Sequence, residues 1–244
     1  MRMNDKTYYI NMDKDIQRNQ DTIKELNKTN LSYERFPGID GRHVDKDKCI
    51  KEGSLSSFAS YCFTNKMIGC GLSHIMLYKY IRNQQKQPID YALILEDDIK
   101  VTQSHLDYSK EINAIIAQHN ITHPHWQIIR LHSMGFDLGS GSAYIISTKH
   151  IECLANMRLL YHNDIQQSFQ YNIVHLNTLF DTKDHDTHYK NPLLNICVQH
   201  QKVGFYLHQH AFSFLHYVVY FYHVIYCIVL LFFYHITKPF LLRK

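Results

Sequence analysis

Residues 91–98 read YALILEDD, a five-residue apolar run that stops at three acidic residues. An apolar run without polar alternation, and of this length, is typical of a strand that is covered on both faces, as in a parallel sheet. In open α/β sheets, ligands bind beyond the carboxyl ends of the strands. The run therefore predicts a central buried strand that delivers an acidic triplet to a binding site.

The segments around this run alternate between strand-like and helix-like patterns. Ile16, Ile23 and Leu26 recur with helical spacing, and we expect further helices over residues 73–82 and 148–160. Strands are expected at residues 6–10, 33–36, 91–95, 127–131, 143–147 and 193–198. Residues 42–66 are polar and mixed, which favours a loop. This alternation predicts an α/β fold, with helices on both faces of one sheet.

Length and composition limit the classes of protein to be considered. The 244 residues suffice for one well-buried domain with a modest appendage. A net charge of +4, dispersed along the chain, does not favour a nucleic-acid partner. Six cysteines without a CxxC pair fit neither a zinc module nor a disulfide framework, so we expect buried thiols.

The C-terminal part of the chain has a different character. Residues 203–237 contain no Asp, Glu, Lys or Arg, and an apolar run of about 20 residues can span a bilayer as a helix. We expect a domain at 1–205, a transmembrane helix at 211–237 and a basic tail at 238–244. The alternatives are a buried or an amphipathic surface helix. The N-terminus lacks a signal-peptide pattern, which favours a cytosolic domain on a membrane-anchored protein.

The acidic triplet is the strongest candidate site. On extended backbone, Glu96 and Asp98 would point to the same side. Two carboxylates on one face suit Mg²⁺ or Mn²⁺, with water and substrate phosphates completing the coordination. Such an ion can neutralise the charge that develops on a leaving diphosphate. The alternative is a solvated acidic turn.

Four segments in this order resemble glycosyltransferase family 25, the lipopolysaccharide and procollagen galactosyltransferase type. They read YYINMDKDIQRNQ (8–20), ERFPGIDGR (34–42), IGCGLSHIMLYKYI (68–81) and YALILEDDI (91–99), and SGSAYIIS (140–147) is a weaker fifth match. The resemblance covers roughly residues 6–150. It implies a GT-A-like fold with a single Rossmann-type mixed sheet flanked by helices. It also implies transfer of a galactose-like hexose from a nucleotide-diphosphate sugar, expected to be a UDP-sugar, to a hydroxyl on a glycan, lipid or protein.

The resemblance also implies roles for individual residues. Glu96 and Asp98 would hold the metal, supported by Asp97. Asn11, Asp13 and Arg18 would lie near the nucleotide, and Arg18 suits phosphate as a counter-charge. His74 could touch the donor or acceptor, or it could be a packed, hydrogen-bonded histidine. Ser73 resembles a helix N-cap, with Gly69 and Gly71 at the helix entry.

The implied reaction is a displacement with inversion, which needs a general base. We expect a carboxylate, and Asp164 is the candidate; Asp181, Asp184 and Asp186 are alternatives. Two other functions stay open at this point. One is a different metal-dependent enzyme on an α/β sheet, such as a phosphohydrolase or nucleotidyltransferase, and the other is a non-catalytic, membrane-tethered descendant.

Overall fold

The computed structural model describes residues 5–84, 90–132, 141–160, 167, 171–176 and 179–182. The chain divides into two units, residues 1–185 and 186–244, and all described residues belong to the first. Several predictions lie outside the described residues: Asp164, Asp184, Asp186, the strand at 193–198 and the membrane helix at 211–237. Among the helices that the structure does describe, none is long and apolar enough to cross a membrane.

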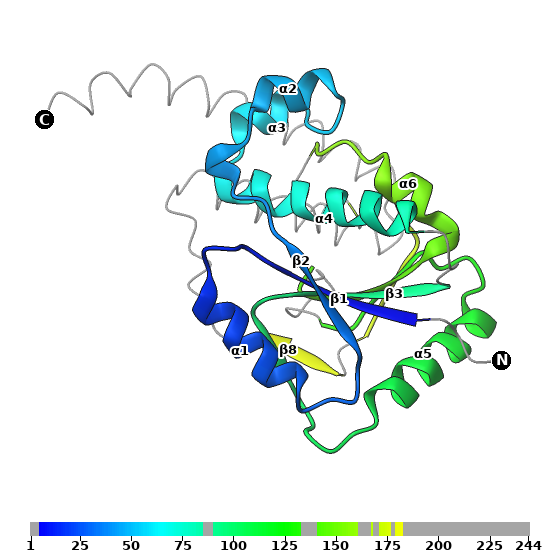
Figure 1. The fold of residues 1–244 in the computed structure, drawn as a ribbon. Coiled ribbons are helices and arrows are strands. Elements are labelled where there is room, and N and C mark those ends of the chain that lie inside the picture. Colours follow the sequence, from blue (N-terminus) through cyan, green and yellow to red (C-terminus); the bar gives the residue numbers. More distant parts are fainter. Residues whose placement is uncertain are drawn as a thin grey trace, which may run out of the picture. The chain divides into compact units, whose positions relative to one another are not determined.

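The centre of the fold is a six-stranded mixed sheet in the order β2-β1-β3-β6-β5-β7. Figure 1 labels its strands β1, β2 and β3. Its strands are β1 (Asp5–Asn11), β2 (Tyr33–Pro37), β3 (Tyr91–Glu96), β5 (Ile128–Arg130), β6 (Ala143–Ser147) and β7 (Ile173–His175). β1 pairs in parallel with β2 and β3, whereas β6 runs antiparallel between β3 and β5. β5 and β7 are parallel. The predicted mixed α/β sheet is confirmed.

β3 is the buried strand that the apolar run predicts. All five residues of the run, 91–95, are at most 8% exposed. β3 lies between β1 and β6, with Ile10 opposite Glu96 and Ala143 opposite Leu95. Its side chains alternate between two hydrophobic cores, because Ile94 belongs to one core while Leu93 and Leu95 belong to the other.

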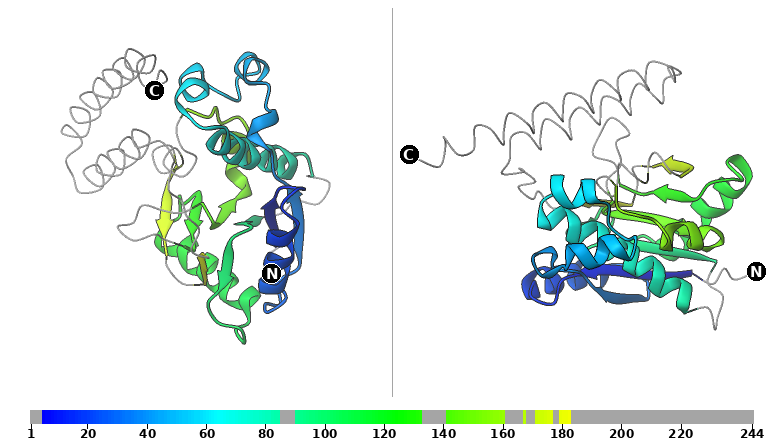
Figure 2. Two further views of the ribbon diagram at one scale, coloured as in Figure 1. Left: turned by 90° about the vertical axis from the view of Figure 1, so that its left-hand side faces the viewer. Right: turned by 90° about the horizontal axis from the view of Figure 1, so that it is seen from above.

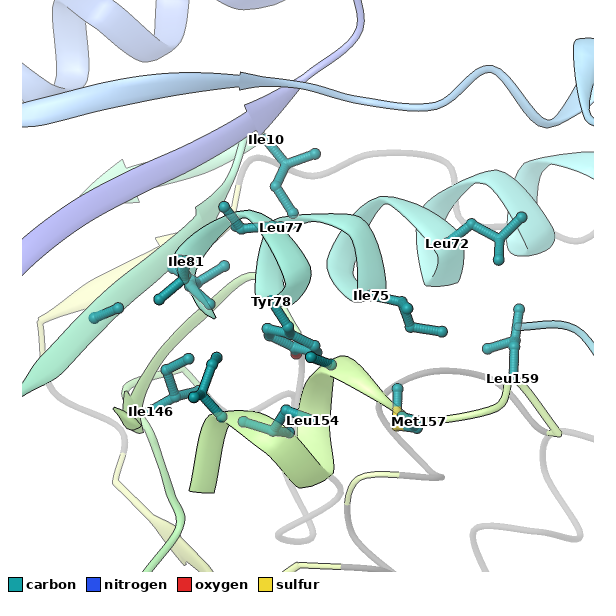
Figure 3. Close-up of a cluster of buried hydrophobic side chains, with 14 of the residues drawn as sticks. Ile10, Leu72, Ile75, Leu77, Tyr78, Ile81, Ile146, Leu154, Met157 and Leu159 are labelled. Carbon is teal, nitrogen blue, oxygen red and sulfur yellow. The ribbon is translucent and has the colours of Figure 1, made fainter. Parts of the chain in front are cut away.

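Helices cover both faces of the sheet (Figure 2). On one face lie α4 (Asn65–Asn83) and α6 (Ile151–Ala155), and on the other lie α1 (Ile16–Leu26) and α5 (Tyr108–Thr122). Figure 3 shows Ile75 and Tyr78 of α4 on the side of the helix that faces Leu154 and Met157. Cys70 and His74 precede Tyr78 at intervals of four residues, so they lie on the same side of α4.

The prediction of a loop over residues 42–66 was wrong. The segment contains η1 (Gly41–His43), α2 (Lys46–Lys51) and α3 (Ser57–Cys62), and α4 begins at its end. Polar residues that suggested a loop are helix N-caps: Asp45 accepts a hydrogen bond from the backbone N–H of Lys48, and Ser56 accepts one from Ala59. Capping explains why short helices form in a stretch without a strong apolar pattern.

α4 begins eight residues before the predicted Ser73, so Ser73 is not its N-cap. Thr64 fills that role and accepts a hydrogen bond from the N–H of Met67. The Ser73 hydroxyl instead donates to the carbonyl oxygen of Gly69 at 2.6 Å and accepts from the N–H of Ile39 at 2.8 Å. Gly69 and Gly71 lie inside the helix rather than at its entry.

Other parts of the secondary structure also differ from the prediction. The helix expected over residues 148–160 is a short η2 (Thr148–His150) followed by α6, which ends at Ala155. The sequence did not lead us to expect α5, β7 or the pair β4 (Ile99–Val101) and β8 (Phe180–Thr182). β4 and β8 form a separate antiparallel ribbon directly after the acidic triplet.

Candidate active site

The candidate site lies at the carboxyl edge of the central sheet. β1, β3 and β5 run in the same direction, because β1 is parallel to β3 and β6 is antiparallel to both β3 and β5. Asn11 ends β1, Glu96 ends β3, and His132 lies two residues after β5. This edge is where α/β sheets bind ligands, and it brings together residues that are far apart in the sequence.

Asp97 joins β3 to β1 and α1. Its carboxylate accepts a hydrogen bond from the Asn11 amide at 2.7 Å and pairs with the Arg18 guanidinium. Its backbone carbonyl accepts from the Thr22 hydroxyl at 2.8 Å. Burial raises the pKa of Asp97, and the Arg18 charge and the Asn11 bond oppose that shift. Asp97 therefore fixes the turn that follows β3.

Asp98 is the carboxylate at this edge that is best suited to receive a cation. Its Oδ2 lies 3.7 Å from Arg18 Nη2, and its Oδ1 is buried with no hydrogen-bond partner among the described residues. Burial, and then the charge of Glu96, raise the pKa of Asp98 to about 7. A buried acceptor without a donor is costly, and a raised pKa means that the ionised carboxylate is disfavoured. A bound cation would offset both costs, because it would pair with the buried oxygen and stabilise the ionised form. The residues present thus fit a divalent metal.

Glu96 faces a different element from Asp98. β3 ends at Glu96 and residues 97–98 form a turn, so the extended alternation expected for Glu96 and Asp98 does not continue. Glu96 Oε1 lies 3.1 Å from His74 Nε2 and 3.7 Å from Cys70 Sγ, both on α4. Asp98 lies toward Arg18 of α1. The two acids are still close enough for the charge of Glu96 to raise the pKa of Asp98.

His74 is buried and has protein partners at both ring nitrogens. Only 1% of its surface is exposed, and its Nδ1 lies 2.7 Å from the Tyr144 hydroxyl. Tyr144 is bonded in turn to the Tyr78 hydroxyl at 2.6 Å, and Tyr78 accepts from the Gln167 amide at 2.7 Å. Of the two possibilities raised by the sequence, these contacts favour the packed, hydrogen-bonded histidine.

Asp13 lies at the exposed margin of the site. Its side chain is 81% exposed and forms an ion pair with Arg35 at 2.6 Å. Arg35, on β2, also donates from Nε to Asn11 Oδ1 at 3.1 Å. Arg35 was not among the residues selected from the sequence, although it lies inside the motif ERFPGIDGR. The structure adds it to Asn11 and Asp13 as part of the same polar group.

His132 and Asp181 form a second pair, which no sequence motif connects. His132 Nε2 lies 3.4 Å from Asp181 Oδ1, which joins the end of β5 to β8. Burial lowers the pKa of His132, and the charges of Asp181 and Glu96 oppose that shift. Asp181 was one of the alternatives for the general base, and this pair places it near the acidic triplet.

Residues 4–218 match the model of glycosyltransferase family 25, described as an LPS biosynthesis protein family. The chain belongs to glycosyltransferase family 25. This match covers most of the chain and includes the segments that contain Asn11, His74 and the acidic triplet. The resemblance seen in the sequence is thereby confirmed, and the family is one of transferases.

Similar proteins include one curated relative and several solved structures. A "Glycosyltransferase 25 family member" of Anopheles gambiae is 28% identical over 100 residues, which is 38% of this chain and 16% of the relative. A glycosyltransferase involved in glycosylation of the PBCV-1 major capsid aligns with 9% identity and a TM-score of 0.42, over 71% of this chain and 81% of that one. A Drosophila β-1,4-galactosyltransferase 7 mutant, in complex with manganese, UDP-Gal and xylobiose, aligns with 10% identity and a TM-score of 0.43, over 78% and 74%.

Proposed function

We propose that this family 25 protein transfers a hexose, galactose-like, from a nucleotide-diphosphate sugar to a hydroxyl acceptor, with inversion and with a divalent metal ion. The observation that carries the proposal is the Asp98 carboxylate at the carboxyl edge of β3. It combines a buried acceptor that has no partner among the described residues with a pKa raised to about 7. A carboxylate of this kind gains from a bound cation, and a divalent ion held by carboxylates commonly binds substrate phosphates as well.

Glu96 and Asp98 would hold the ion, with Mn²⁺ or Mg²⁺ as the candidates. When bound, the ion would neutralise the charge on the leaving diphosphate. Glu96 is positioned by His74, and Asp98 by the turn that Asp97 fixes. Carboxylate oxygen ligands at a strand end fit either of these hard cations. The identity of the ion is part of the proposal.

Arg18, Asn11 and Asp13 would bind the nucleotide end of the donor. The Arg18 side chain is 37% exposed and lies against both Asp97 and Asp98. The partly exposed guanidinium would supply a positive charge and N–H donors to a phosphate oxygen. Asn11 is held by Asp97 and Arg35, which fixes its orientation at the end of β1.

A carboxylate would take the proton from the acceptor hydroxyl as the displacement proceeds. Asp164, outside the described residues, remains our candidate for this general base. Asp181 is the described alternative, because its side chain is 63% exposed and lies beside His132. Which of the two acts can be decided by comparing Asp164→Asn with Asp181→Asn at saturating donor, where loss of the base lowers kcat.

The substrates follow from the same site. A UDP-sugar is the proposed donor, as the resemblance to the family implies. The acceptor would be a hydroxyl of a glycan, lipid or protein. Attachment to a membrane through residues 211–237 stays a prediction, and so does the side of the membrane that the domain faces.

The test is donor turnover by the full chain. With Mn²⁺ and UDP-galactose, the wild-type protein should hydrolyse or transfer the sugar, and Asp98→Asn should lose that activity. Asp47→Asn removes an exposed acid of α2 and is the matched control. Turnover of sugar-free nucleotides or phosphate esters would favour a phosphohydrolase or nucleotidyltransferase. A folded protein that binds no nucleotide diphosphate would be a non-catalytic descendant.

A further inference from the structure

Three side chains of different chemistry meet beside the end of β3. Cys70 and His74 are four residues apart on α4, so they lie on one face of the helix. With Glu96 they place one ligand atom each within 4.8 Å of one another. His74 Nε2 is 3.1 Å and Cys70 Sγ is 3.7 Å from Glu96 Oε1. Tetrahedral zinc, with bonds of about 2.0–2.3 Å, separates its ligand atoms by roughly 3.3–3.8 Å.

The environment of His74 is that of a histidine prepared to bind metal. Metal-binding histidines usually donate their second ring N–H to a neighbouring oxygen, which fixes the ring. In this protein the Tyr144 hydroxyl lies 2.7 Å from Nδ1, and it belongs to a buried chain through Tyr78 and Gln167. Without metal, Nε2–H donates to Glu96 and Nδ1 accepts from Tyr144. With metal on Nε2, the proton sits on Nδ1 and Tyr144 accepts it.

The ligand types select the metal. A thiolate and an imidazole favour zinc over Mg²⁺ or Mn²⁺, whereas the carboxylates around Asp98 favour the harder ions. Cys70 is not in a disulfide, and neither Cys70 nor Glu96 is fully buried, which leaves a route for the ion. Binding replaces the thiol proton of Cys70, which is released to solvent, and changes the tautomer of His74 without net proton loss.

We propose that Cys70, His74 and Glu96 form a zinc site with a fourth position open, next to the donor-metal site. Because Glu96 belongs to both sites, zinc withdraws Glu96 from the ion that holds the diphosphate. Zinc therefore inhibits the Mn²⁺-dependent reaction. The binding of zinc is independent of the proposed function, and only the inhibition rests on it.

The binding test uses Co²⁺ as a spectroscopic substitute for zinc in the full chain. The wild type should bind Co²⁺ with the absorption of a thiolate–cobalt bond, and Zn²⁺ should displace it. Cys70→Ser should lose that band and bind at least about 10–100-fold more weakly. Cys153→Ser removes an exposed cysteine of α6 and should keep the band. A band that persists in Cys70→Ser, or a wild type without one, would overturn the site.

A second measurement needs no variant. Zinc should slow the alkylation of Cys70 in the wild type, read by mass spectrometry of the modified peptides, and should leave the alkylation of Cys153 unchanged. Equal rates at Cys70 with and without zinc would reject the proposal even if Cys70→Ser failed to fold.

The inhibition test separates this inference from the proposed function. Zinc should reduce Mn²⁺-dependent donor hydrolysis by the wild type, and the fractional reduction should be much smaller in Cys70→Ser, each measured against its own zinc-free rate. Asp98→Asn should lose the Mn²⁺-dependent activity yet retain the cobalt band. If Asp98→Asn stays fully active, the donor-metal site is wrong. If the band is missing while Asp98→Asn is inactive, the zinc site alone is wrong.

Discussion

Gly69 of α4 lies directly against the backbone of Gly41 in η1. A Cβ atom on Gly69 would lie 2.6 Å from the Gly41 nitrogen and 2.6 Å from the Ile39 carbonyl oxygen. Two of the quoted motifs, ERFPGIDGR and IGCGLSHIMLYKYI, therefore meet backbone to backbone. Because Cys70 and His74 follow Gly69 within the next five residues of the same helix, this contact helps to set where their side chains lie relative to Glu96.

Gly69→Ala should destabilise the fold by roughly 1–3 kcal/mol, as overpacking against rigid backbone does. Gly71→Ala is the matched control, because the three atoms nearest to its Cβ would all belong to the Leu159 side chain, the closest at 2.6 Å, and a side chain can move. The better helix propensity of alanine, up to about 1 kcal/mol, offsets part of both costs. Urea denaturation should give a lower midpoint for Gly69→Ala than for Gly71→Ala, and the reverse order would contradict the contact.

Asn11→Ala should destabilise the protein by roughly 1.5–3 kcal/mol, the range for a hydrogen bond to a charged group. The change removes the 2.7 Å bond to Asp97, which is only 8% exposed. The loss should be larger at pH 8 than at pH 4, because the bond favours the ionised Asp97. Asn83→Ala, at an exposed position at the end of α4, is the comparison for chemical denaturation at both pH values. An equal loss of unfolding free energy at both pH values would show that the hydrogen bond to Asp97 is not the source of the effect.

Without metal, Asp98→Asn should raise the free energy of unfolding at pH 8 and change it little at pH 4. The pKa of Asp98 is raised to about 7, so the native state holds its proton more tightly than the unfolded chain does. That contribution to stability is complete below the unfolded pKa of about 3.9 and is lost as the pH rises through about 7. The check is the difference in unfolding free energy between variant and wild type, with a chelator present. A difference independent of pH would mean that Asp98 titrates normally.

The affinity for Mn²⁺ should depend on pH in the same window. Binding requires the ionised carboxylate, so affinity should rise up to about tenfold per pH unit below pH 7 and level off above it. Titration of the full chain followed by electron paramagnetic resonance of free Mn²⁺ measures this directly. Asp98→Asn should bind weakly at every pH, and a steep dependence that survives in that variant would assign the titration to another group.

The sequence predicted the elements whose pattern is local. The run 91–95 was identifiable as a buried strand because all its side chains are apolar, and residues 143–147 because Ser147 alone interrupts a similar run. A strand that is buried on both faces has the same apolar pattern whether it runs parallel or antiparallel to its neighbours. The antiparallel orientation of β6 could therefore not be deduced from the sequence. The start of α4 was missed because its cap, Thr64, and its interior glycines resemble a loop.

The candidate site could be predicted only in part, because several of its contacts join residues that are far apart in the sequence. The acids after β3 stand out in the sequence, and family resemblance selected Asn11 and His74. Tyr144 is separated from His74 by 70 residues, and its hydroxyl is one of many tyrosine hydroxyls in the chain. Such contacts depend on sheet order and register, which the sequence pattern does not specify.

The most direct test of the donor-metal site is calorimetric titration of UDP into the full chain, with and without Mn²⁺. The wild type and Asp47→Asn should bind UDP only when Mn²⁺ is present. A folded Asp98→Asn should bind UDP at least about tenfold more weakly. Equal, Mn²⁺-independent binding of UDP by Asp98→Asn and the wild type would contradict a donor-metal site at Asp98.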